Sequence, residues 1–97
     1  MDVHGTIAAY HAHQAAEKGL KALQIHRTGD HERTHDLVRL YHDLDVPRRF
    51  RSVLEDLNPA DTAARYPDAP EVEVQRPDEM LDEVEAVLTW TRKRLNE

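Results

Sequence analysis

The sequence contains no cysteine, and this absence excludes two kinds of architecture. A chain without cysteine forms neither a disulfide framework nor a thiolate metal site, and it suits a reducing compartment. No hydrophobic run is long enough to cross a membrane, and the N-terminus lacks the pattern of a signal peptide. We therefore expect a soluble cytoplasmic protein with no membrane partner.

Glycine (3 residues) and aromatic residues (5%) are scarce, whereas charged residues make up 33% of the chain. This composition is typical of a small helical protein. A chain of 97 residues forms one domain, residues 1–97, with a single modest core. The net charge of −6 argues against a general nucleic-acid coat, although a local basic patch can still contact phosphates.

One segment organises the expected fold, because its small and apolar residues recur at helical spacing and share one face. These residues are Ala9, Ala12, Ala16, Leu20 and Leu23. Alanine lets neighbouring helices approach closely, so the segment predicts a central helix that ends near Arg27, with Gly29 as a left-handed stop. Glu17 and Lys21 on this helix form a favourable i,i+4 pair.

Three further helices are predicted. The second has Thr34 as its N-cap and Asp36 in its first turn, and its apolar stripe is Leu37, Leu40, Tyr41 and Leu44. The third carries Phe50, Val53, Leu54 and Leu57 and is broken at Asn58-Pro59. The last opens at Pro77 and faces the core with Met80, Leu81, Val84, Val87, Leu88, Thr91 and Leu95.

Residues 58–76 hold most of the prolines and predict a structured loop, with a short helical turn over residues 61–65. The expected fold class is therefore all-α. We predict an antiparallel up-and-down bundle of three long helices, a shorter helix and this proline-rich loop.

Residues 31–35 match the letters of the zinc-hydrolase motif H-E-x-x-H, in which two histidines one helical turn apart hold the metal. Here the motif follows a glycine turn, no third ligand is evident, and Thr34 resembles a cap. We therefore expect no metal site, with His31 and Glu32 in a solvated loop. His11 and His13 diverge on a helix and cannot chelate one ion, and His4, His26 and His42 are expected at the surface.

Phe50 lies inside the basic cluster Arg48-Arg49-Phe50-Arg51, which is compatible with an RNA or phosphate contact. Phe50 also belongs to the apolar stripe of the third helix, so we favour a solvated face formed by the three arginines.

Three blocks follow one another along the chain: Gln14-Ala15-Ala16-Glu17-Lys18 with Leu20-Lys21-Ala22, then Thr34-His35-Asp36-Leu37, then Ala64-Arg65-Tyr66-Pro67-Asp68. Together and in this order they resemble the HEPN domain (higher eukaryotes and prokaryotes nucleotide-binding). The resemblance extends from about Ala9 to Leu95. It implies a helical bundle, often a homodimer, in small prokaryotic proteins encoded beside a minimal nucleotidyltransferase as toxin–antitoxin pairs.

Two departures from the family pattern affect the expected function. Family members usually carry a helix before the Gln/Glu-Lys block, and here that block starts at Gln14, so we expect this helix to be absent or short. The apolar surface left uncovered predicts a homodimer, with helices exchanged between chains as one form of it; a truncated chain is the alternative.

The second departure concerns catalysis. Ribonuclease members use Arg, four to six residues, then His, the Arg holding phosphate and the His moving protons. No arginine here has a histidine at that distance. The resemblance therefore implies a noncatalytic nucleotide- or substrate-binding module. The alternative is a ribonuclease that uses His35 with Arg39 or Arg65.

A nucleotide site is hypothesised from the polar residues of the three blocks, without a cofactor. They are Gln14, Glu17, Lys18, Lys21, His35, Asp36, Arg65, Tyr66 and Asp68. Lys21 and Arg65 would hold phosphate, and Tyr66 would stack on a base. In the other interpretation, Glu17, Lys21, Arg65 and Asp68 form an ion-pair network that fixes the loop, and His35 and Asp36 only cap a helix.

Overall fold

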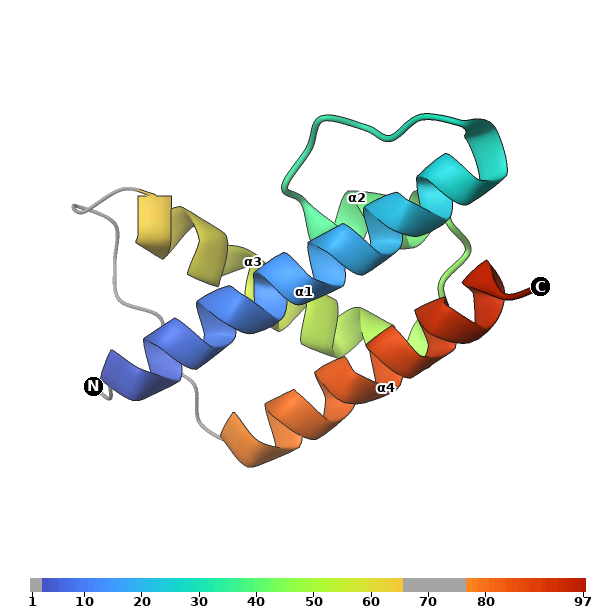
Figure 1. Cartoon of the computed structure of the whole chain (residues 1–97). Coiled ribbons are helices and arrows are strands. Elements are labelled where there is room, and N and C mark those ends of the chain that lie inside the picture. Colours follow the sequence, from blue (N-terminus) through green and yellow to red (C-terminus); the bar gives the residue numbers. More distant parts are fainter. Residues whose placement is uncertain (1–2, 66–76) are drawn as a thin grey trace.

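The computed structural model describes residues 3–65 and 77–97, and this part of the chain is helical without any strand. The helices are α1 (Val3–Thr28), α2 (Leu37–Asp43), α3 (Arg51–Arg65) and α4 (Pro77–Leu95), with a 3₁₀ turn, η1 (Arg48–Phe50), before α3. Figure 1 shows α3 crossing behind α1, with α4 running below α1. The predicted all-α class is confirmed.

Helix α1 is the centre of the molecule and contacts α2, α3 and α4 of its own chain. Its predicted face is buried throughout, from Ala9 at 1% exposure to Leu23 at 0%. The helix ends as expected, because Gly29 has a φ of +86° and its N–H donates to the carbonyl of Ile25 at 2.8 Å. The central position predicted for this helix is confirmed.

The Asp36 side chain caps α2, so the prediction of Thr34 as N-cap is wrong. Asp36 has extended backbone angles and lies directly before the first helical residue, so its carboxylate accepts the N–H groups of Val38 and Arg39. The Thr34 hydroxyl lies two residues too early and instead accepts the N–H of Asp36 at 3.1 Å. The predicted stripe of α2 is confirmed: Leu37, Leu40, Tyr41 and Leu44 are buried.

The predicted end of the third helix at Asn58-Pro59 is wrong, because α3 continues through Pro59 to Arg65. A proline inside a helix removes one backbone hydrogen bond, and the alanine-rich residues that follow favour helix strongly enough for α3 to continue. The stripe Phe50, Val53, Leu54 and Leu57 is buried as predicted. The rest of the predicted loop, residues 66–76, lies outside the described residues.

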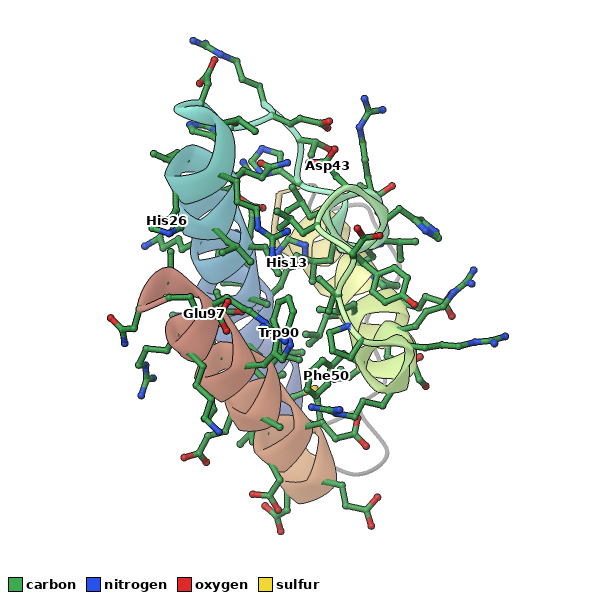
Figure 2. All side chains as sticks on the ribbon, turned by 90° about the vertical axis from the view of Figure 1, so that its right-hand side faces the viewer. His13, His26, Asp43, Phe50, Trp90 and Glu97 are labelled. Carbon is green, nitrogen blue, oxygen red and sulfur yellow. The ribbon has the colours of Figure 1, made fainter. Side chains whose placement is uncertain are left out.

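Helix α4 begins at Pro77 as predicted, but Leu81 was wrongly assigned to the core and is 44% exposed. The missed residue is Trp90, which packs against the core and meets the Phe50 ring edge-on at 6.5 Å (Figure 2). Trp90 extends the buried face of α4 toward Phe50 of η1, whereas Leu81 remains exposed. Val84, Val87 and Thr91 are buried. Met80, Leu88 and Leu95 are partly buried.

Two glycines of the chain should respond oppositely to the same substitution. A Cβ on Gly19 would lie 3.4 Å from Leu88 Cδ2 and 3.6 Å from Thr91 Cγ2, which are ordinary contacts between α1 and α4. Gly19→Ala should therefore stabilise the protein by about 0.5–1 kcal/mol. Gly29→Ala should destabilise it by about 1–2 kcal/mol, since alanine disfavours the positive φ.

Urea unfolding of both variants, compared with the unsubstituted protein, measures the two changes. A loss of stability in Gly19→Ala would show that α1 and α4 approach too closely for a methyl group.

Candidate functional site

The polar centre of the molecule is the carboxylate of Glu17, whose side chain is 8% exposed. Glu17 Oε2 accepts from Lys21 Nζ at 3.2 Å, which confirms the predicted i,i+4 pair. Glu17 Oε1 accepts from His35 Nδ1 at 2.9 Å, across 18 residues of sequence. A single carboxylate of α1 therefore binds both a lysine of its own helix and the segment that leads into α2.

His13 supports the same contact from inside the molecule and is fully buried. Its Nε2–H donates to the backbone carbonyl of His35 at 2.9 Å, and its Nδ1 lies 3.9 Å from Glu17 Oε1. In Figure 2, the His13 side chain lies between α1 and the part of the molecule formed by α2 and α3. His35 is thus held twice, once by its ring and once by its backbone. We call Glu17, Lys21, His35 and His13 the Glu17 network.

Gln24 extends the attachment of this segment toward the end of α1. Its side-chain oxygen accepts the N–H of Glu32 at 3.1 Å, and its side-chain nitrogen donates to Asp43 at 2.9 Å. Arg27 donates to the carbonyl of Leu44 at 2.9 Å. Polar contacts from α1 therefore fix both the segment before α2 and the end of α2.

Asp36 joins α2 to α3 as well as capping α2. Asn58 of α3 donates to Asp36 Oδ1 at 2.9 Å and accepts the N–H of Leu37 at 2.9 Å. Asp36 Oδ1 therefore accepts hydrogen bonds from two backbone N–H groups and one side chain. It acts as a structural anchor in this geometry.

The structure brings some of the hypothesised nucleotide-site residues together. Glu17 binds both Lys21 and His35, and Asp36 follows His35 directly. On α1, Lys18 is exposed and Gln14 is half-buried. Arg65 ends α3 seven residues after Asn58, roughly 10 Å farther along the helix axis. Its side chain, Tyr66 and Asp68 lie outside what the structure describes, so the hypothesis is untested for them.

Sequence reasoning missed His13, Gln24 and Asn58. The periodicity contained a signal for His13, because it lies four residues after Ala9 and three before Ala16, on the buried face. No spacing rule would have found Asn58, since its partners lie more than 20 residues earlier.

The H-E-x-x-H letters do not form the helical zinc site, because residues 29–36 connect α1 to α2 without helical structure. His31 Nδ1 contacts the carbonyl of Glu32, whereas His35 Nδ1 binds Glu17. Within residues 3–65 and 77–97, no cluster of three or more His, Asp or Glu side chains is arranged to hold a metal ion.

The basic cluster before α3 has its aromatic residue inside the core. Phe50 is 5% exposed, and the guanidinium of Arg49 lies 4.6 Å from the centre of its ring. The three arginines are exposed, and Arg51 binds Glu55 at 2.7 Å. Phe50 is therefore not available to stack on a base, and the predicted solvated face is confirmed.

A comparison with protein families decides the class of this molecule. The family model described as "HEPN domain" matches residues 4–95. The chain belongs to the HEPN family. No curated protein and no solved structure produced a match. The HEPN match covers α1 to α4, so the Glu17 network and Asp36 lie inside the domain. Membership of this family supports a module related to nucleotides or RNA in a general sense.

In the described part of the chain, no helix is apolar enough over sufficient length to cross a membrane.

The two glutamates in i,i+4 pairs allow a matched test of the Glu17 network. Glu17→Gln removes a charge that is almost buried and leaves Lys21 without its counter-ion, so it should cost about 2 kcal/mol of stability. Glu55→Gln removes the same charge from the exposed pair with Arg51 and should cost less than about 0.5 kcal/mol. Urea unfolding of both variants gives the comparison. Equal effects would show that the Glu17 network is no more important than a surface ion pair.

Proposed function

We propose that this HEPN domain is a noncatalytic module that binds a nucleotide or RNA and works with a minimal nucleotidyltransferase, as in a prokaryotic toxin–antitoxin pair. The family supports the general relation to nucleotides or RNA. The sequence supports the noncatalytic role, since no arginine is followed by four to six residues and then histidine. In this proposal the protein is located in the cytoplasm and forms a homodimer.

The observation that carries the noncatalytic role is the Glu17–His35 contact. An imidazole oriented by a carboxylate can act as a general base, but here the contact joins α1 to the segment before α2. Arg39, one of the two arginines that the ribonuclease alternative pairs with His35, is held by Glu32, whose hydrogen bond and charge raise the pKa of Arg39 above its usual value. His35 and Arg39 are thus each engaged in a contact within the domain, and the side chain of Arg65, the other arginine of that alternative, lies outside the described residues.

The proposed nucleotide surface is the part of α1 beside the Glu17 network. Lys18 is exposed there, while Lys21 is largely covered and its charge is balanced by Glu17. Lys18 would therefore contribute most of the attraction for a phosphate, with Gln14 and the half-exposed His35 ring beside it. Asp36 already accepts three hydrogen bonds at Oδ1, so only its Oδ2 would contribute a contact to a ligand.

We predict that the purified protein does not cleave RNA and that it binds ATP, used as a nucleotide probe, through Lys18. Fluorescence titration with a labelled ATP should show binding weakened at least several-fold in Lys18→Ala, with unchanged unfolding by urea. Lys93→Ala, which removes an exposed lysine of α4, is the control and should bind as the unsubstituted protein does.

RNA cleavage that survives purification and disappears in His35→Ala would contradict the noncatalytic role. Equal ATP affinity in Lys18→Ala and Lys93→Ala would contradict the proposed nucleotide surface. Capture of a nucleotidyltransferase by the tagged protein in its native lysate tests the proposed partnership separately.

A further inference from the structure

Helix α4 carries its charges in two separate blocks, and it lies at the edge of the molecule in both views (Figures 1 and 2). The first half of the helix is acidic and the last turn is basic. The exposed acidic residues are Asp78, Glu79, Asp82, Glu83 and Glu85, and the exposed basic residues are Arg92, Lys93 and Arg94. A helix with one acidic and one basic half is complementary to a second copy of itself that runs in the opposite direction.

The helix dipole explains only part of this separation. Its effect fades within the first turn, so it favours Asp78 and Glu79 but hardly reaches Asp82 and Glu85. The arrangement also places like charges one turn apart, at Asp78 and Asp82 and again at Glu79 and Glu83, which destabilises an isolated helix. The like charges of the acidic block therefore destabilise α4, and no basic residue one turn away on the helix compensates for them.

Other helices of the chain place opposite charges at the same spacing, as in Glu17–Lys21 on α1 and Arg51–Glu55 on α3. On α4, Arg94 binds Glu97 at 2.8 Å. Among the described residues, no ion pair involves the remaining charges of the helix beyond its first turn, namely Asp82, Glu83, Glu85, Arg92 and Lys93. These charges are available to a partner.

We propose that α4 is the docking surface for a second copy of this chain, with the two α4 helices antiparallel. Four exposed residues form one stripe on the outer side of α4, at spacings of four, three and four: Asp82, Ala86, Thr89 and Lys93. The stripe is self-complementary about a two-fold axis that passes between Ala86 and Thr89. The small side chains of this pair permit close approach of the helices at the axis.

The two-fold axis places Asp82 opposite the partner's Lys93, twice in the dimer. These two contacts lie roughly 16 Å apart along the helix, which is the rise over eleven residues. The flanking charges match in the same arrangement, since Glu85 lies near the partner's Arg92 and Glu83 near the partner's Arg94. Glu83 and Glu85 then each meet a basic residue, whereas Asp78 and Glu79 of the first turn lie near the partner's Glu97 and gain no such contact. A contact of one helix pair with small central side chains is modest in area, so we expect a reversible dimer that weakens with salt.

This inference rests on the homodimer proposed above and assigns its surface. Two charge reversals test it by mixing. In Asp82→Lys, two lysines face each other at each contact, and in Lys93→Glu, two acidic residues do, so each variant alone should associate at least about tenfold more weakly than the unsubstituted chain. In an equimolar mixture, the introduced lysine of one variant meets the introduced glutamate of the other. The second contact of that mixed pair is the original one between Asp82 and Lys93, so heterodimers should form.

Sedimentation velocity over a range of protein and salt concentrations measures the association, with circular dichroism to verify that each variant is folded. Glu85→Lys with Arg92→Glu forms a second pair of reversals if a variant at Asp82 does not fold. Asp56→Lys on α3 and Arg33→Glu before α2 are the controls, because they make the same charge changes at exposed positions away from α4.

Loss of self-association in each variant, with recovery in the mixture, supports the proposal. An unsubstituted chain that stays monomeric at every concentration and at low salt overturns both the homodimer and its surface. Dimers whose strength is unchanged in all four α4 variants overturn the surface alone and leave the homodimer standing. Neither result bears on ATP binding through Lys18, which is measured separately.

Discussion

The structure depends most on the carboxylate of Glu17, which is held almost out of water on the central helix. A buried charge is stable only when it is paired, and Glu17 obtains its partners from two places, Lys21 on the same helix and His35 beyond the turn. His13 adds a bond to the backbone of His35. The result is a fixed path for the connection to α2, and that path sets where Asp36 caps α2 and where Asn58 of α3 can bind it.

Much of the fold was predictable because it follows from local spacing. The buried faces of α1, α2 and the start of α3 were read from apolar periodicity, and Gly29 and Pro77 marked two helix ends. The errors arose where a longer-range contact, or the sequence that follows, determined the helix end or the buried residue. The sequence predicts a helix end at Pro59, although the alanines after it continue α3, and it places Leu81 in the core, although Trp90 packs there and Leu81 is exposed.

The candidate site was predictable only in part, for a similar reason. Glu17 and Lys21 are one turn apart, so their pairing followed from the sequence. The partner that gives Glu17 its importance, His35, is 18 residues away, and only the folded chain shows that its ring reaches the carboxylate. This geometry places His35 and Asp36 among the groups that hold the HEPN domain together. Lys18 remains an exposed cation on α1, and the charges of α4 beyond its first turn face solvent.

The tautomers of the His13 and His35 rings test the Glu17 network most directly. Nitrogen-15 NMR measures them at pH 8, where unperturbed imidazole is neutral. Because His35 donates to Glu17 through Nδ1, it should carry its proton on Nδ1, whereas His13 should carry it on Nε2, the atom that binds the His35 carbonyl. Finding opposite tautomers in these two residues is the predicted result. A His35 ring protonated on Nε2 alone would contradict the account, since Glu17 would then have no donor from the segment before α2.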